Sequence, residues 1–139
     1  MSRNYVIHPI PLVKHAEFLK MRMAHLPLYS GLWTAGLQVD YGETVPMATY
    51  VWYLEGGEQN IIVDAGITAE RFAARGHKVE QIQTLDQGLN KLGLKPDDID
   101  VLIITHLDHD HIALAHQFRK AKVIVQRAEI EFARNPHPF

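Results

Sequence analysis

The feature that most constrains the fold is a short apolar run followed at once by a cluster of polar side chains. Residues 101–104 are Val, Leu, Ile and Ile, and such a β-branched run predicts a buried strand. The cluster after it consists of Thr105, His106, Leu107, Asp108, His109, Asp110 and His111. It therefore lies at the carboxyl end of a strand, where α/β folds open their ligand crevices. Five metal-capable side chains in six consecutive positions predict a metal site there.

Length and composition limit the class of protein. With 139 residues, of which 47% are hydrophobic, the chain can bury one core, so we expect a single domain over residues 1–139. Cysteine is absent, which leaves histidine and carboxylate side chains as the candidate metal ligands. The net charge of −2 and the scattered lysines and arginines predict no nucleic-acid partner.

The same composition bears on membranes and location. The longest apolar runs are far shorter than a membrane-spanning helix, so no membrane partner is predicted. The first residues carry neither the apolar core of a signal peptide nor a small-residue cleavage site. We therefore expect a cytoplasmic protein.

Strand and helix patterns alternate along the rest of the chain. Two glycines, Gly56 and Gly57, separate two strand-like segments and predict a hairpin. Residues 21–33 are apolar without a clean period and suggest a loop or short helix near a pocket, or a core segment. The expected elements are an edge strand or extended lead-in broken by prolines (5–13), the hairpin (45–54 and 60–64), helices (68–74 and 82–93), a strand (101–104), a helix (112–120), a strand (122–126) and a helix (127–134).

The polar cluster suits metal catalysis. Such catalysis needs ligands fixed on the backbone while other coordination positions stay open for water and substrate, and a strand-to-helix turn supplies that arrangement. Alternating Asp and His side chains can face two metal ions that share a hydroxide able to attack an ester-like carbonyl. Three alternatives are a solvated surface loop, the His-Asp pair of an HD-type phosphohydrolase, which belongs on a helix, and an amidohydrolase barrel, which needs a much longer chain.

Several segments resemble one known family. Residues 105–111 resemble the metal signature Thr-His-x-His-x-Asp-His of the metallo-β-lactamase superfamily, and residues 60–66, Asn-Ile-Ile-Val-Asp-Ala-Gly, resemble its earlier Asp-x-Gly turn. Residues 123–133 are similar to the N-acyl homoserine lactonase branch. The resemblance covers residues 45–133. It implies an α/β fold of the metallo-β-lactamase type, specifically the N-terminal half of a four-layer αβ/βα sandwich.

The resemblance also implies a role for each residue of the cluster. The candidate metal ligands are His106, Asp108, Asp110 and His111. The first two would bind one divalent ion, and the last two would bind a second. Asp110 would also move a proton near the leaving group, which makes it the candidate catalytic residue. Asp64 would orient the ligands through hydrogen bonds, and His109, at the variable position of the signature, would lie outside the ligand set.

The sequence departs from the family pattern in three ways. Asp108 stands where the family has a second histidine, and its harder oxygen donor favours manganese or iron while still allowing zinc. Residues 112–115 replace the small glycines that usually follow the last ligand. The family completes its site with two histidines and a bridging aspartate further downstream. His116 and His137 are the later histidines of this chain, and neither is a convincing replacement.

Two functions follow from these observations. The first is a metal-dependent hydrolase that opens lactones or related esters, such as N-acyl homoserine lactones, with a metal-bound hydroxide. The second is a catalytically incomplete domain that binds metal or serves as an interaction module. Half a sandwich would expose one face of a sheet, so we expect a homo-oligomer or a complementing chain. The isolated chain is expected to hydrolyse lactones poorly or not at all.

Overall fold

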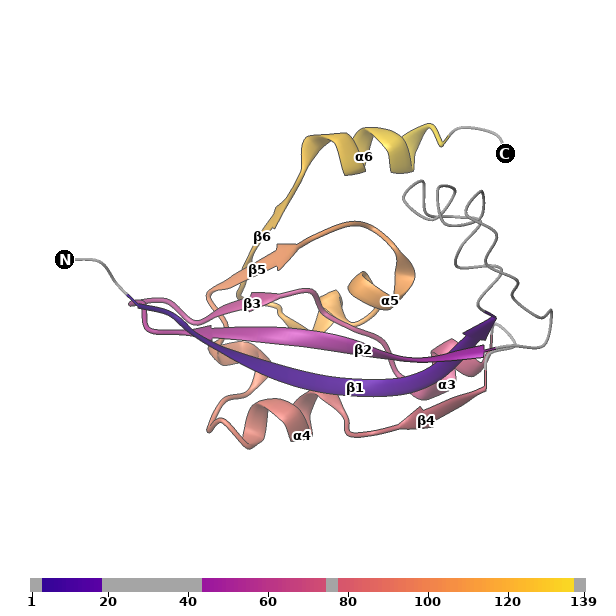
Figure 1. Cartoon of the computed structure of the whole chain (residues 1–139). Helices are drawn as coiled ribbons and strands as arrows, with labels where there is room; N and C mark the ends of the chain where they lie inside the picture. Colours follow the sequence, from indigo (N-terminus) through magenta and orange to yellow (C-terminus); the bar gives the residue numbers. More distant parts are fainter. Residues whose placement is uncertain (1–3, 19–43, 75–77, 137–139) are drawn as a thin grey trace.

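The computed structural model, which describes residues 4–18, 44–74 and 78–136, is built around one six-stranded mixed sheet (Figure 1). The strands are β1 (Val6–Phe18), β2 (Thr44–Glu55), β3 (Ile61–Val63), β4 (Val79–Gln81), β5 (Val101–Ile104) and β6 (Lys122–Val125). Their order across the sheet is β4-β1-β2-β3-β5-β6. β1 pairs antiparallel with both β4 and β2, and β2 pairs antiparallel with β3. β3, β5 and β6 run parallel, so the chain leaves these three strands at the same edge of the sheet.

The helices are short and lie on the loops that connect the strands. They are α3 (Ala69–Ala73), α4 (Leu85–Asn90), α5 (His109–Ile112) and α6 (Arg127–Arg134). Figure 1 shows α4 beside β1, whereas α6 stands apart beyond β6. Within the described ranges, no helix is long and apolar enough to cross a membrane.

The core lies between the sheet and these connecting segments. Four neighbouring strands contribute fully buried side chains to it, namely Leu12, Val51, Ile62 and Leu102. Leu89 of α4 and Phe118, which follows α5, close the same cluster. Three of the four residues of β5 are buried, so the backbone of this strand is held firmly where the polar cluster begins.

The opposite face of the sheet carries a continuous apolar row. The strand registers place Trp52, Val63, Ile103 and Ile124 side by side across β2, β3, β5 and β6. Trp52 and Ile124 are 38% and 45% exposed. Association with a second chain stays a prediction.

Several sequence-based predictions of secondary structure are confirmed. The predicted hairpin is formed by β2 and β3. The predicted helix after residue 68 is α3, and the Thr68 hydroxyl caps it by accepting the N–H of Arg71. The predicted strands over 101–104 and 122–126 and the predicted terminal helix are β5, β6 and α6. The segment 21–33 lies outside the described residues.

Two predicted helices were placed wrongly. The helix expected over 82–93 begins only at Leu85, because Thr84 and Gln87 form a reciprocal capping box there, and Ile82 remains outside the helix. The helix expected over 112–120 is replaced by α5, which begins at His109, and by a separate 3-10 turn. Leu114, which lies between them, donates its N–H to the carbonyl of Gly66, so the turn after β3 takes a group that a continuous helix would use.

The predicted edge strand was right only in part. β1 is an interior strand, because β4 covers it on the side away from β2. β4, however, pairs only with residues 13–15, so Pro9 and Pro11 lie where β2 is the single strand partner. A proline lacks the N–H that a second partner would need, which explains this position.

The packing of β5 yields the first prediction. Leu102→Ala should lower the free energy of unfolding by about 2–5 kcal/mol, because Leu102 is fully buried. Val123 is the matched control, since it pairs with Leu102 in register on β6 but is 53% exposed. Val123→Ala should cost less than about 1 kcal/mol. Urea unfolding of both variants measures the difference, and equal losses would contradict the assignment of β5 to the core.

Candidate metal centre

The candidate site is built from two turns at the carboxyl ends of parallel strands. Asp64 follows β3, and Thr105 follows β5, its direct neighbour in the sheet. Asp64 has a φ of 61°, in the left-handed region, which Asp tolerates better than most residues. Its backbone N–H donates to the carbonyl of Ile103 at 2.8 Å, so the parallel pairing continues one residue past β3. This turns the Asp64 carboxylate toward the end of β5.

The Asp64 carboxylate is the hub of the site. Its side chain is only 5% exposed. It accepts hydrogen bonds from the Thr105 backbone N–H and the Thr105 hydroxyl, each at 2.9 Å, and from Nδ1 of His111 at 2.8 Å. One buried carboxylate thus connects the end of β3 to the end of β5 and to α5.

The ionisation of this pair follows from its contacts. Burial alone would raise the pKa of the Asp64 carboxyl, but hydrogen bonds from His111 and Thr105 outweigh it and hold the pKa below its usual value of 3.8. The hydrogen bond to Asp64 raises the pKa of His111 above 6.5, against the opposing effect of burial, and the charge of Asp110 adds to the increase. Asp64 is therefore ionised at neutral pH.

Hydrogen bonding also sets the tautomers of two histidines. The Thr105 hydroxyl donates its one proton to Asp64, so it accepts at its contact with Nδ1 of His106, 3.0 Å away. Nδ1 of His106 must then carry a proton. Nδ1 of His111 carries one as well, since its partner is the Asp64 carboxylate. In the neutral form of either ring, Nε2 keeps a free lone pair, which is the state that binds metal.

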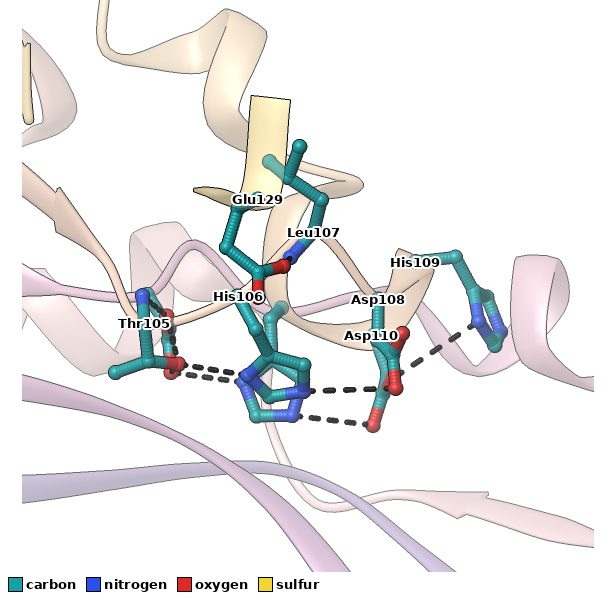
Figure 2. A network of polar contacts seen from close by, with 9 residues as sticks. Thr105, His106, Leu107, Asp108, His109, Asp110 and Glu129 are labelled. Atoms are coloured by element: carbon teal, nitrogen blue, oxygen red, sulfur yellow. Dashed lines mark hydrogen bonds and ion pairs between the residues drawn. The ribbon is translucent and has the colours of Figure 1, made fainter. Parts of the chain in front are cut away.

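Both Nε2 atoms face carboxylates. Nε2 of His106 lies 3.5 Å from Asp108, and Nε2 of His111 lies 3.6 Å from Asp110. The two imidazole rings are neighbours, with their centroids 3.9 Å apart. Figure 2 shows His106 directed toward Asp108 and Asp110. The four predicted ligands therefore gather as two His-Asp pairs.

The four side chains differ in how firmly they are held. The Asp108 side chain is 77% exposed, whereas Asp110 and His111 are 21% and 27% exposed. Within residues 4–18, 44–74 and 78–136, no three His, Asp or Glu side chains converge closely enough to hold a metal ion together. The donors are thus arranged in pairs rather than in a closed coordination sphere. Their assignment as ligands stays a prediction.

The remaining predicted site residue points elsewhere. Figure 2 shows His109 directed away from His106. Its ring meets Phe72 of α3 edge-on at a centroid distance of 5.5 Å, and its Nδ1 lies 3.8 Å from Asp110. The sequence-based prediction that His109 lies outside the ligand set stays untested, and this position is compatible with it.

Three residues that position the site were not singled out from the sequence. Thr105 belongs to the quoted signature, and its place between a strand and a histidine was the available signal. Glu129 of α6 accepts the N–H of Leu107, and Arg71 of α3 donates to the carbonyl of Ala113 at 2.7 Å, just after α5. The residues in the first contact are 22 positions apart in the sequence, and those in the second are 42 positions apart. A local sequence pattern therefore could not predict either contact.

The fold and the site together define the class of protein. A family model of the metallo-beta-lactamase superfamily matches residues 44–139, well over half of the chain. The chain belongs to this superfamily, and the predicted family and fold class are confirmed.

Individual proteins with a similar sequence or structure include lactonases and a probable hydrolase. N-acyl homoserine lactonase AiiB of Agrobacterium fabrum is 28% identical over 100 residues, which cover 64% of this chain and 35% of that protein. A solved structure of a probable metal-dependent hydrolase from Staphylococcus aureus has a TM-score of 0.71 at 21% identity, covering 99% of this chain and 52% of that one. The structure of AidC, a dizinc quorum-quenching lactonase in complex with a product, has a TM-score of 0.65 at 18% identity, covering 99% and 47%.

The matches cover only part of each similar protein. The two structural likenesses show the fold alone. The chain spans about half the length of the solved structures and about a third of the lactonase.

The Asp64–His111 contact yields a pH prediction for the metal-free protein. The lowered pKa of Asp64 contributes stability above pH 3.8 that is lost as the pH falls through its folded pKa. The raised pKa of His111 contributes stability below pH 6.5 that is lost as the pH rises through its folded pKa. The stability difference between wild type and Asp64→Asn should therefore be largest between these values and shrink toward pH 9.

Urea unfolding at pH 6, 7, 8 and 9 measures this difference. The control is the same comparison in a His111→Ala background, where the dependence between pH 6 and 9 should vanish because the partner is gone. A difference that stays constant with pH in the wild-type background would show that the contact does not couple to protonation of His111.

Proposed function

We propose that this chain carries the metal-binding turn of a hydrolase that opens lactones or related small esters, N-acyl homoserine lactones among them. The observation that supports it best is the shared hydrogen-bond network of Asp64. This network leaves His106 and His111 each with Nδ1 protonated and Nε2 facing a carboxylate. Fixing the imidazole through its other nitrogen is how proteins prepare histidine to bind metal.

The separation of the donor atoms supports the same proposal. A histidine nitrogen and a carboxylate oxygen that bind one tetrahedral zinc ion at about 2.0–2.2 Å lie about 3.3–3.5 Å apart. The corresponding distances here are 3.5 Å for His106 and Asp108 and 3.6 Å for His111 and Asp110. Direct hydrogen bonds between such groups are typically about 2.7–2.9 Å. The pairs are therefore spaced more like two ligands of one ion than like hydrogen-bonded partners.

We assign the four predicted ligands to a pair of divalent ions, two side chains to each. His106 and Asp108 would hold one ion, and Asp110 and His111 would hold the other. Such ions supply Lewis-acid activation of water and of the ester carbonyl. The oxygen donor of Asp108 favours manganese or iron and still permits zinc, the metal named for AidC.

The chain's own residues would divide the remaining work. Asp110 is the candidate catalytic residue, and its carboxylate would take a proton from the attacking water and pass it to the leaving alkoxide as the ring opens. Asp64 would keep both imidazoles oriented, and His109 would support Asp110 from the side away from the ligands. The lactonases among the relatives support this choice of substrate class. Water adds to the carbonyl and the ring ester bond breaks, which gives the hydroxy acid.

Metal binding supplies the first test of this function. The purified chain should bind Mn²⁺ or Zn²⁺, and His111→Ala should weaken the affinity by roughly ten-fold or more, because a lost ligand should cost at least as much as a lost supporting contact. His116→Ala is the matched control, since His116 lies five residues later, outside the four candidate ligands, and its Nδ1 contacts the Ala113 carbonyl. Isothermal titration calorimetry measures both affinities. Equal affinity in wild type and His111→Ala would remove the site assignment.

Activity supplies the second test. The 139-residue chain alone should open N-acyl homoserine lactones poorly or not at all, whereas a chain extended through the C-terminal half of the fold should open them in the presence of Mn²⁺, Fe²⁺ or Zn²⁺. Asp110→Asn should lower kcat by roughly 10²-fold or more, because it loses both a proton carrier and a charged ligand. Chromatographic detection of the ring-opened acid measures the rate. Metal binding by the extended chain without hydrolysis of any lactone or ester would favour a metal-binding or interaction module instead.

A further inference from the structure

We propose that Glu129 is a positioning residue for the first candidate metal pair, His106 and Asp108. This inference rests on the proposed function and extends it to a residue outside the metal signature. Oε2 of Glu129 accepts the backbone N–H of Leu107 at 3.0 Å. Leu107 is the residue between the two candidate ligands, and Figure 2 shows the Glu129 carboxylate directed at its amide. A carboxylate from α6 thus holds the peptide that joins the two ligands.

The loop between β5 and α5 is held at alternate amides. The Thr105 N–H donates to Asp64, and the Leu107 N–H donates to Glu129. Both acceptors are carboxylates, which form stronger hydrogen bonds to N–H groups than neutral acceptors do. The candidate ligands His106 and Asp108 occupy the positions between and after these two fixed amides. The direction in which each ligand leaves the backbone therefore depends on both carboxylates.

Leu107 is fixed on its other side by packing. Its side chain is partly buried against the core cluster, so the residue cannot turn freely about the backbone. The Asp108 side chain, by contrast, is 77% exposed, and one of its carboxylate oxygens lies 3.5 Å from Nε2 of His106. Packing therefore does little to place Asp108. The position of the Asp108 side chain therefore depends on its backbone, and Glu129 fixes that backbone one residue earlier, at Leu107.

The position of Glu129 in α6 indicates that its carboxylate contributes little to the stability of the core. α6 has no buried residue, and Glu129 lies in its first turn. An acidic side chain there is favoured by the helix dipole whether or not it reaches Leu107. The loss of this carboxylate should consequently loosen the loop between β5 and α5, which carries the candidate ligands, without removing a core contact.

Amide exchange tests the contact without any metal. In Glu129→Ala the Leu107 amide should exchange with solvent about ten-fold or more faster, as measured by ¹H–¹⁵N NMR, because its acceptor is gone. Glu129→Gln should retain most of the protection, since its side-chain oxygen can still accept. Glu131→Ala is the matched control, because it removes the same charge two residues later on α6 and should leave Leu107 unchanged. Unchanged exchange in Glu129→Ala would overturn the proposal.

Metal titration tests the role. With Mn²⁺ or Zn²⁺, Glu129→Ala should weaken one of the two binding steps by roughly 10–100-fold and leave the other near wild type, and Glu129→Gln should largely restore it. Full affinity at both steps in Glu129→Ala, despite rapid Leu107 exchange, would overturn the positioning role. A wild-type chain that binds no metal would overturn the proposed function and this role with it, while the exchange result would still show whether the Glu129–Leu107 contact exists. Circular dichroism of each variant checks that it is folded.

Discussion

The carboxylate of Asp64 is the contact on which the candidate site depends. It receives hydrogen bonds from the end of β5 and from α5, and through the Thr105 hydroxyl it also determines which nitrogen of His106 carries a proton. Such an arrangement requires a nearly buried acceptor that stays ionised, and the donors around Asp64 keep it so. A single side chain therefore sets the orientation of two histidines that stand five residues apart.

This contact exists because of the sheet topology. β3 and β5 are parallel neighbours, so the turns that follow them meet at one edge of the sheet. The turn after β3 also binds α5 through the backbone, because the N–H of Ala65 donates to the His111 carbonyl and the Gly66 carbonyl accepts from Leu114. The turn after β3, far earlier in the sequence, thus holds α5 at His111 and just beyond its end at Leu114. Fold and site are consequences of the same strand pairing.

Much of this could be predicted from local pattern, and the errors have local causes. The apolar run of β5 and the density of polar side chains after it indicated both the strand and the site, and the family signature indicated the fold. The extent of α5 could not be predicted, because the Gly66 carbonyl that takes the N–H of Leu114 is distant in sequence. The start of α4 could have been predicted, since Thr84 and Gln87 have the spacing of a capping box. The spacing of Ile82 from the later apolar residues instead favoured an earlier start.

Residues that support the site were harder to find than its ligands. Metal ligands cluster in sequence here because one turn carries them. Their supports come from other elements: Asp64 from the turn after β3, Arg71 from α3 and Glu129 from α6. Asp64 was found through the family resemblance, which preserves an aspartate at that turn. Arg71 and Glu129 act on backbone groups, and a backbone acceptor or donor leaves no mark in the sequence.

The protonation state of the imidazole nitrogens is the most direct test of whether Asp64 orients both histidines. Long-range ¹H–¹⁵N NMR of the histidine side chains, recorded at alkaline pH with and without Zn²⁺, reports each nitrogen separately. We expect His106 and His111 both to be protonated on Nδ1, and we expect Zn²⁺ to shift the Nε2 resonances of these two rings while those of His116 stay in place. A proton on Nε2 of either ring in the metal-free protein, or Nε2 resonances that ignore Zn²⁺, would contradict the central role given to Asp64.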